Sequence, residues 1–151
     1  MRIAIVASRF NQVVTDQLVA GARSALTSHG IEDSSIVSAS VPGAFELPLV
    51  AQRLAASGEV DAVVCLGAVI RGATDHNIHI ATQCAAGLQR VQLDTGVPVV
   101  FGVLTTDTLE QALERAGGKA GSDASENKGF EAAETAVEMV GLLRRLPKEV
   151  G

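Results

Sequence analysis

Apolar and polar residues alternate along this chain in two regular ways. Short runs rich in β-branched residues predict strands, and apolar positions spaced three or four apart predict amphipathic helices. Four runs predict strands at residues 2–8, 35–40, 60–66 and 97–104, and a helical pattern follows each of them. Because strands that are apolar throughout are covered on both faces, the pattern predicts an α/β fold: one three-layer, doubly wound domain over residues 1–151, with a four-stranded parallel sheet between helices.

Residues typical of helix ends bound the predicted helices. Asn11 is placed to cap the first helix, and Gly30 is placed to end it in a left-handed conformation. Residues 67–75 are expected to form a long turn into the third helix. Asp107, followed by Glu110 three residues later, is typical of a capping box before the fourth helix. A polar, Gly-rich stretch then precedes the last helix, whose inner face is predicted to carry Phe130, Ala133, Val137, Val140 and Gly141.

Composition narrows the range of partners. The chain has 151 residues, 47% of them hydrophobic, which is enough to bury a core without disulfides or a structural metal. Its net charge of -5 matches nucleic acids and anionic membrane surfaces poorly. Nine of its twelve basic residues are arginine, whose planar group suits phosphate and carboxylate. We therefore expect no nucleic-acid or membrane partner, while anionic small molecules remain possible at local cationic clusters.

Apolar stretches and cysteines indicate the cellular compartment, and the size of the predicted sheet indicates the assembly. No stretch reaches the roughly 18 apolar residues of a membrane span, and we expect no signal peptide because a β-branched run follows Arg2 directly. Cys65, in a predicted strand, and Cys84, on a predicted helix, are typical of small buried thiols in a reducing compartment. We therefore expect a cytoplasmic protein. A small sheet with Ala- and Gly-rich helices also favours burial against copies of itself, so we expect a homo-oligomer.

Residues suited to ligand binding follow the predicted strands. In an open parallel sheet, ligands bind beyond the carboxyl ends of the strands. Phe10 and Asn11 follow the first strand, residues 43–46 follow the second, residues 67–76 follow the third, and residues 101–107 end the fourth. The chain has neither Trp nor Tyr, yet three of its four Phe, at positions 10, 45 and 101, lie at or near this edge. These rings either stack on a planar ligand or plug the rim of a small core.

The segment of residues 70–76 is the strongest candidate for anion binding. It brings together a glycine, a hydroxyl and a helix start, an arrangement that binds anions through backbone N–H groups. His76 lies at that helix start, and imidazole is the side chain that exchanges protons near neutral pH. His29 is expected at a helix end and His79 on the surface or at an interface. A metal site formed by His76 and His79 is not expected.

Several charged residues allow two interpretations. Arg115, Lys119 and Lys128 are either cations for a ligand or ordinary helix-end and solvated loop charges. Glu46 is either a first-turn helix acid or a hydrogen-bond partner for ligand hydroxyls. Composition and spacing leave both choices open.

Six short segments, in order over nearly the whole chain, resemble the motifs of one family. They are ASRFN at 7–11, VPGAFELP at 41–48, GAVIRGAT at 67–74 with His76 after it, FGVLTT at 101–106, ERAG at 114–117 and NKG at 127–129. Together they resemble the lumazine synthase (6,7-dimethyl-8-ribityllumazine synthase) family. Six motifs at matching strand ends make this resemblance far more specific than any one of them.

The resemblance implies a flavodoxin-like form of the fold and a function. It implies that a transferase condenses 5-amino-6-(D-ribitylamino)uracil with 3,4-dihydroxy-2-butanone 4-phosphate, the penultimate step of riboflavin biosynthesis, without a metal or organic cofactor. His76 is implied to be the proton shuttle. The residues implied to bind the two substrates are Phe10, Asn11, Ala44, Phe45, Glu46, Ala68, Val69, Ile70, Ala73, Thr74, Phe101, Arg115 and Lys128.

The same resemblance divides the site between adjacent subunits. It implies that one subunit stacks Phe10 on the pyrimidine, lines the ribityl chain with residues 44–46 and holds the phosphate at Ala73 and Thr74. It implies that the neighbour supplies Arg115 to the phosphate and Phe101 to close the pocket. Lys128 is implied to be a second contact to ligand oxygens, and Lys119 competes with it for this role. A homopentamer is the expected assembly, because the long stretch from Gly117 to Lys128 resembles that of members that stop at pentamers.

Residues 77–79, Asn-Ile-His, depart from the aromatic residue and acid that are usual in the family. This departure leaves open a catalytically impaired pentameric scaffold, or a flavin- or lumazine-binding protein of the same fold. The doubly wound fold by itself also permits a mononucleotide-binding module. The segment that precedes the first strand in many relatives is expected to be absent. His76, Arg115 and Phe10 together favour the synthase.

Overall fold

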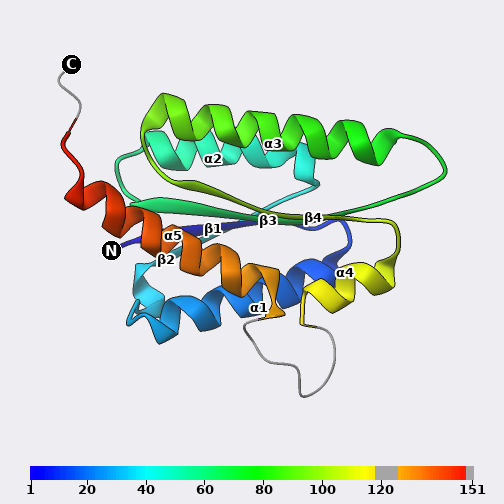
Figure 1. Cartoon of the computed structure of the whole chain (residues 1–151), viewed down its shortest axis with the longest axis horizontal. Coiled ribbons are helices and arrows are strands. Elements are labelled where there is room, and N and C mark those ends of the chain that lie inside the picture. The colour runs from blue at the N-terminus through cyan, green and yellow to red at the C-terminus, as the bar shows by residue number, and fades with distance from the viewer. Residues whose placement is uncertain (118–125, 149–151) are drawn as a thin grey trace.

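Figure 1 shows the computed structural model, which describes residues 1–117 and 126–148. Within these two stretches the chain alternates strands and helices. The strands are β1 (Ile3–Ser8), β2 (Ile36–Val41), β3 (Ala62–Ile70) and β4 (Val99–Thr106). The helices are α1 (Gln12–Ser28), α2 (Leu47–Ala56), α3 (His76–Thr95), α4 (Leu109–Arg115) and α5 (Lys128–Arg145). Single-turn 3-10 helices precede β2 and α2, as η1 (Asp33–Ser35) and η2 (Ala44–Glu46).

The sheet has the strand order β2-β1-β3-β4, and each neighbouring pair is parallel. In Figure 1, α2 and α3 cover one face of the sheet, and α1, α4 and α5 cover the other. The predicted three-layer, doubly wound α/β fold is therefore confirmed, and its strand order is flavodoxin-like. None of the described helices combines the length and the apolar character that crossing a membrane requires.

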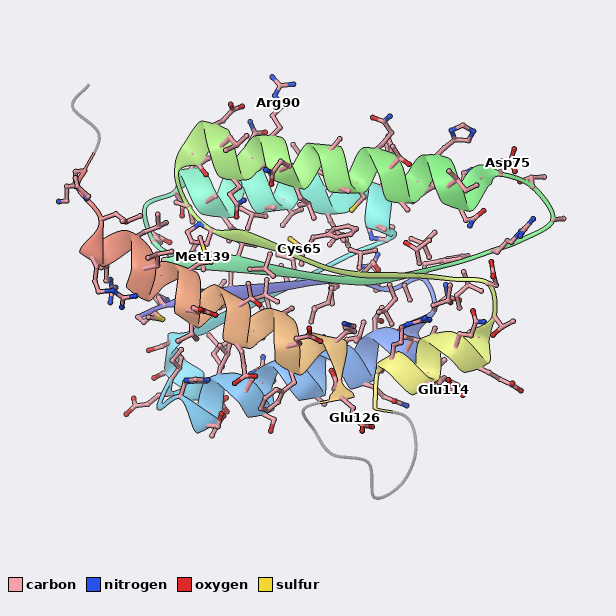
Figure 2. The ribbon with its side chains drawn as sticks, in the orientation of Figure 1. Cys65, Asp75, Arg90, Glu114, Glu126 and Met139 are labelled. Atoms are coloured by element: carbon pink, nitrogen blue, oxygen red, sulfur yellow. The ribbon has the colours of Figure 1, made fainter. Side chains whose placement is uncertain are left out.

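β3 lies at the centre of both cores. Its residues 62–69 are all buried, because alternate side chains of a strand enter opposite faces of the sheet. Val63 and Cys65 pack in the cluster that includes α2 and α3, whereas Val64 and Leu66 pack in the cluster that includes α1 and α5. Figure 2 shows side chains filling the space on both sides of the sheet. The apolar run that predicted this strand is thus the consequence of two covered faces.

The predicted long turn at residues 67–75 is wrong in its first half. β3 continues from Leu66 to Ile70, because residues 67–70 stay paired with residues 103–106 of β4. Gly67 does not mark a turn. A Cβ at this position would come within 2.9 Å of Ser8 Oγ, so glycine here permits close packing inside the sheet. The turn itself is shorter and occupies only the residues between Ile70 and His76.

Two predicted helix caps differ from the structure: Asn11 is the N-cap residue of α1 but makes no side-chain capping bond, and Asp107 is not the cap of α4. Asn11 has a φ of 62°, and its side chain does not cap α1 but donates from Nδ2 to the Ala68 carbonyl oxygen at 3.1 Å. Asp107 does not cap α4 either: Thr108 does, since its hydroxyl oxygen accepts from the Gln111 N–H at 3.1 Å. The Asn11 amide is instead bound by a carbonyl that is distant in sequence. At α4, the cap is the residue that follows Asp107. The predicted left-handed end of α1 is confirmed at Gly30, where φ is 79°.

The last helix carries the predicted inner face. Ala133 and Val140 are buried, and Phe130 and Val137 pack against the same core with part of their surface exposed. Gly141 is half-buried. The helix begins with a cap at Asn127, whose side-chain oxygen accepts from the Gly129 and Phe130 N–H groups.

Both cysteines are buried and free, as expected. Burial raises the pKa of the Cys65 thiol far above its usual range, and the nearby Cys84 raises it further. Burial raises the pKa of Cys84 to about 11. Because the thiolate is the nucleophilic form, neither residue is equipped for covalent chemistry near neutral pH.

Candidate functional site

A cavity of about 530 Å³, here called the edge cavity, opens at the carboxyl edge of the sheet. Its walls come from the turn after β1, from η2, and from the segment that joins the end of β3 to α3. The predicted site residues that the structure brings together here are Phe10, Ala44, Phe45, Glu46, Ala68, Val69, Ile70, Thr74 and His76. Two further lining residues, Gly43 and Gly72, belong to the predicted edge segments without an assigned role, whereas Asn77 and Ile80 were not predicted.

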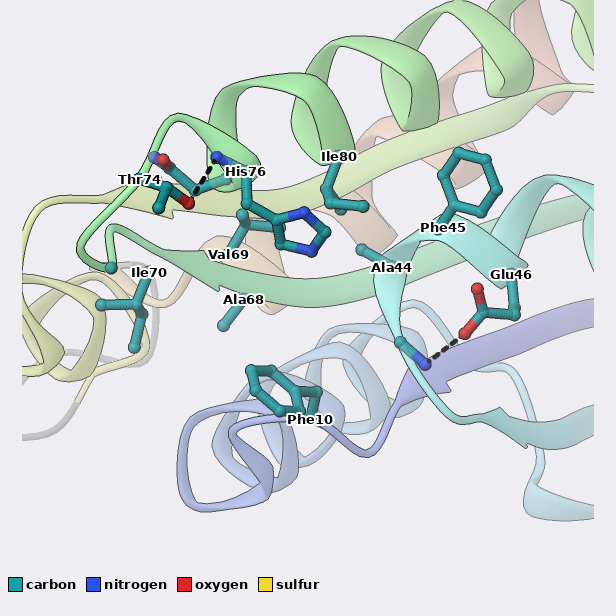
Figure 3. A pocket seen from close by; sticks show the side chains of 13 residues that line it. Phe10, Ala44, Phe45, Glu46, Ala68, Val69, Ile70, Thr74, His76 and Ile80 are labelled. Atoms are coloured by element: carbon teal, nitrogen blue, oxygen red, sulfur yellow. Dashed lines mark hydrogen bonds between the residues drawn. The ribbon is translucent and has the colours of Figure 1, made fainter.

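Two phenylalanine rings flank the edge cavity. Phe10, in the turn after β1, is 70% exposed, and Phe45, in η2, is 58% exposed. Figure 3 shows the two rings on different walls of the cavity, Phe10 near Ala68 and Phe45 near Ala44. Rings this exposed do not plug the core. Their exposure therefore argues against the alternative that these two residues fill the rim of the core, and stacking on a planar ligand stays a prediction.

The end of β3 extends past the strand beside it on one side. β1 pairs with β3 only as far as Ala7 opposite Leu66, whereas β3 runs on to Ile70 against β4. Residues 67–70 therefore have no strand beside them on the β1 side of the described sheet. The turn after β1 partly covers this side, since Asn11 Nδ2 donates to the Ala68 oxygen. Asn11 does not line the edge cavity; what the structure gives it is an anchoring bond between the turn that carries Phe10 and the end of β3.

Glu46 lies on the η2 wall of the edge cavity. Its Oε1 accepts from the Gly43 N–H at 2.9 Å, a contact drawn in Figure 3. This bond satisfies a free N–H at the start of the helical segment, as the first-turn interpretation predicted. Because the residue also lines the cavity, the carboxylate remains placed to accept from ligand hydroxyls as well. Both interpretations of Glu46 are therefore compatible with its position.

The turn between β3 and α3 approaches the cavity with its backbone. Gly72 and Thr74 line the cavity, and all residues from Arg71 to His76 are exposed. Thr74 Oγ1 accepts from the His76 N–H at 3.3 Å. The opposite side of the turn is tied to β4, because the Arg71 N–H donates to the Thr106 oxygen at 2.8 Å. Ala73 belongs to the same turn but does not line the cavity.

His76 is the first residue of α3, and its ring is the one imidazole among the residues that line the edge cavity in the described chain. Figure 3 shows this ring reaching into the cavity, with Phe10 on the facing wall. His79 is exposed and lies outside the lining, as expected. His29, at the end of α1, shares a hydrogen bond with Glu134 at 3.2 Å. In residues 1–117 and 126–148, no three His, Cys, Asp or Glu side chains are grouped to hold a metal ion.

Phe101, Arg115 and Lys128 do not lie at the edge cavity. They line a second depression of about 480 Å³, here called the cationic cleft, between the outer edge of β4 and the helices α4 and α5. The expectation that Phe101 lies near the carboxyl edge is wrong, because β4 continues to Thr106 and Phe101 pairs with Cys65 inside the sheet. Its ring is 44% exposed on the edge strand. Lys119 lies outside the described residues.

The two cations of the cationic cleft differ in their contacts. Lys128 Nζ lies 3.0 Å from Glu131 Oε2, one turn along α5. Arg115 is the last residue of α4 and is exposed. Both line the same depression, so an anion that enters it meets an arginine fork and a lysine ammonium together.

Asn127 joins the elements that carry these cations, and sequence reasoning assigned it no role. Its Nδ2 donates to the Ala116 oxygen at 2.7 Å and to the Gln17 oxygen at 2.9 Å, while its Oδ1 caps α5. The residue is 7% exposed. A methyl group at Gly21 would overlap this amide, so glycine at that position admits it. The side chain therefore fixes the end of α4 and the start of α5 against α1. Its signals in the sequence were an asparagine before a helix and its place in the NKG motif.

The chain matches a known protein family. A family model described as 6,7-dimethyl-8-ribityllumazine synthase matches residues 1–144 of this chain. The match includes every residue of the edge cavity and every residue of the cationic cleft.

Proposed function

We propose a function from one premise: the chain belongs to the 6,7-dimethyl-8-ribityllumazine synthase family. The proposed reaction condenses 5-amino-6-(D-ribitylamino)uracil with 3,4-dihydroxy-2-butanone 4-phosphate to 6,7-dimethyl-8-ribityllumazine, and it releases phosphate and two water molecules. The observation that carries the proposal is the edge cavity, in which an exposed ring, open strand backbone, a helix start and an imidazole meet. Each of these groups suits one part of the two substrates.

The pyrimidine substrate is assigned to the wall between β1 and β3. Phe10 stacks on its ring, since an exposed aromatic face next to a cavity suits a planar ligand. The backbone of residues 68–70, which has no strand on its β1 side in the described sheet, pairs with the polar edge of the pyrimidine. Residues 44–46 line the ribityl chain, and the Glu46 carboxylate accepts from its hydroxyls.

The phosphate substrate is assigned to the turn at Ala73 and Thr74 and to the start of α3. Backbone N–H groups and the positive end of the helix dipole favour a phosphate at such a place. The cavity lining among the described residues contains neither lysine nor arginine. A cation for the phosphate must then come from outside this lining.

The reaction itself requires mainly positioning and proton transfer. The primary amine of the pyrimidine attacks the ketone carbon, and loss of water gives an imine. A proton then leaves the adjacent carbon and phosphate leaves the terminal one; after tautomerisation, the ribityl-bearing amine attacks the new carbonyl, and a second water leaves as the ring closes. Holding both substrates together contributes on the order of 7 to 11 kcal/mol in the best cases. His76, at the cavity wall, accepts and donates the protons and contributes roughly 10²- to 10⁴-fold.

A second copy of the chain supplies the missing cation. The edge cavity and the cationic cleft share no lining residue, and Arg115 and Lys128 belong to the cleft. In a ring of copies, the cleft of one subunit faces the cavity of the next, and Phe101 closes the pocket. We therefore propose a homopentamer with one site at each subunit contact. A cytoplasmic location stays a prediction.

The test is to mix the purified protein with both substrates and follow product absorbance, with the uncatalysed rate subtracted. We expect acceleration, and we expect His76→Ala to lower kcat by about 10²-fold without abolishing it. His79→Ala is the matched control, since this neighbouring imidazole lies outside the cavity lining, and it should behave as the wild type. A folded oligomer without any acceleration would contradict the synthase proposal in favour of a non-catalytic scaffold.

A further inference from the structure

One buried polar atom at the edge cavity has no partner. Asn77, the second residue of α3, is 9% exposed, whereas its sequence neighbours from Arg71 to His79 are all exposed. No hydrogen-bond partner in residues 1–117 or 126–148 reaches its Oδ1. An amide oxygen withdrawn from water without a hydrogen bond lowers the stability of a fold, and such atoms are few in native proteins.

Comparison with a second such atom separates packing from ligand binding. Ser8 Oγ, at the end of β1, is the other buried side-chain oxygen without a partner in the described part of the chain. It is enclosed by the sheet, since a Cβ on Gly67 would come within 2.9 Å of it. Asn77, in contrast, lines the edge cavity. Of the two, only Asn77 is within reach of a bound ligand.

We infer that Asn77 is a substrate-binding residue that recognises the hydroxyketone part of the phosphate substrate, an inference that rests on the proposed function. A side-chain amide carries an acceptor oxygen and a donor nitrogen on the same carbon. The substrate carries a hydroxyl and a ketone on neighbouring carbons. Once rotation about the last torsion brings Oδ1 to the cavity, this oxygen accepts from the substrate hydroxyl.

The place of Asn77 on α3 suits this role. Thr74 and His76, which line the same cavity, are the residues assigned to the phosphate and to proton transfer. In the substrate, the carbon that carries the hydroxyl is bonded directly to the carbon that carries the phosphate ester. With the phosphate at the start of α3, the hydroxyl therefore lies close to the first turn of this helix. Oδ1 is buried in the free protein, and because the last side-chain torsion of asparagine is broad, binding requires only a rotation about it to bring this oxygen to the cavity. A substrate hydroxyl then satisfies an oxygen that has no partner in the free protein.

The pyrimidine is the less suitable partner for this amide. It is assigned to the wall formed by Phe10 and the end of β3, where backbone groups meet its polar edge. Asn77 belongs instead to the α3 wall, next to His76, the residue assigned to proton transfer. An amide in this position distinguishes a hydroxyketone phosphate from a phosphate without the hydroxyl.

The experiment measures that distinction by isothermal titration. The probes are 3,4-dihydroxy-2-butanone 4-phosphate and its analogue without the 3-hydroxyl, 4-hydroxy-2-butanone 4-phosphate. We expect the wild-type oligomer to bind the first about tenfold more tightly, and Asn77→Leu, which has a similar shape and no polar atom, to bind both alike. Gln83→Leu is the matched control, since it removes an exposed amide from the same helix, and it should discriminate as the wild type does.

Stability separates this role from a structural one. Because Asn77→Leu replaces an oxygen without a partner by an apolar group, thermal unfolding should occur at the same temperature or higher. Lost stability together with unchanged discrimination would overturn the inference. If Asn77→Leu does not fold, Asn77→Ala removes the amide without adding bulk and gives the same comparison.

Failure of the proposed function gives a different result. A wild-type protein that binds neither phosphate and forms no product overturns the proposed function and this inference together. A wild-type protein that forms product, while its Asn77→Leu variant still prefers the hydroxyketone tenfold, overturns only the role of Asn77.

Discussion

The edge cavity and the cationic cleft differ in the chemical groups that line them and in their position on the sheet. The edge cavity has exposed rings, open backbone and a helix start, and its lining in the described chain contains neither lysine nor arginine. The cationic cleft has Arg115 and Lys128 beside a single exposed ring, Phe101. The cavity is formed by turns that leave the sheet at its carboxyl edge, whereas the cleft lies along the open edge of β4.

Neither depression alone therefore offers every group that a ligand with both a planar ring and a phosphate requires. The cavity offers a stacking surface and backbone N–H groups, and the cleft offers side-chain cations. A phosphate held by both kinds of group requires two surfaces that face each other. The homo-oligomer proposed above supplies this arrangement by symmetry, because it pairs the cationic cleft of one subunit with the edge cavity of the next.

The largest expected effect is complementation between two defective variants. Arg115→Ala should raise the KM for the phosphate substrate by about 10²-fold, because a charged hydrogen-bond partner is lost. Oligomers assembled from equal amounts of His76→Ala and Arg115→Ala subunits should recover roughly a quarter of the wild-type activity, since that share of contacts joins an intact cavity to an intact cleft. Steady-state kinetics after joint refolding measures the recovery.

The control for complementation pairs two variants of the same cleft. Oligomers of Arg115→Ala and Lys128→Ala subunits contain no intact cleft, so they should show no recovery beyond the mean of the two variants. An equal lack of recovery for the His76→Ala and Arg115→Ala pair would contradict a site shared between copies. It would then place the cavity and the cleft in separate functions.

The next largest effect concerns the Asn127 side chain, which joins the helices that line the cationic cleft. Asn127→Ala should lower the free energy of unfolding by about 3 kcal/mol, because α5 loses its cap and the Ala116 and Gln17 oxygens lose their donor. Circular dichroism in urea at fixed protein concentration measures this, since the chain has no Trp or Tyr to report by fluorescence. Thr108→Ala, which removes only the α4 cap, is the control and should cost about 1 kcal/mol. Equal losses for both variants would show that the amide contributes nothing beyond capping.

The smallest effect concerns the helix layer that carries the edge cavity. Cys84 lies on the buried face of α3, and its pKa is raised to about 11 from about 9. Between these pH values the unfolded chain loses the thiol proton while the folded chain keeps it, so the stability is present below pH 9 and declines as the pH rises. The thiol should account for a loss of about 1 kcal/mol between pH 7 and pH 10.

The measurement for Cys84 compares urea unfolding at the two pH values. Cys84→Ala removes the ionising group, so its loss of stability between pH 7 and pH 10 should be smaller than that of the wild type, whatever its stability at pH 7. Buried Cys65 acts in the same direction and remains in both proteins. An equal pH dependence in the two proteins would contradict the assigned role of the Cys84 thiol.

The fold and much of the edge cavity followed from local patterns. Apolar runs and helical spacing are properties of neighbouring residues, so they predicted the order of elements and the parallel sheet. The rule that parallel strands end at one edge then brought Phe10, Phe45 and His76 to one place. Prediction failed where pairing with the adjacent strand overrides the local preference of a residue. Gly67 has the residue type of a turn, yet it lies inside β3 because it pairs with β4.

Only the tertiary structure decided which of the predicted residues meet. Asn11 has the residue type of a helix cap, yet the carbonyl oxygen that takes its amide belongs to Ala68, 57 residues away. Asn77 is buried beside a cavity although every neighbour in sequence from Arg71 to His79 is exposed. Phe101 lies on an open sheet edge because β4 is the last strand of the sheet, and it lies away from the carboxyl edge because β4 runs on past it. The sequence determined the strands, the helices and the chemistry available at their ends, because these depend on residues close along the chain. The division of that chemistry into a cavity and a separate cleft depends on contacts between distant segments, which only the folded chain defines.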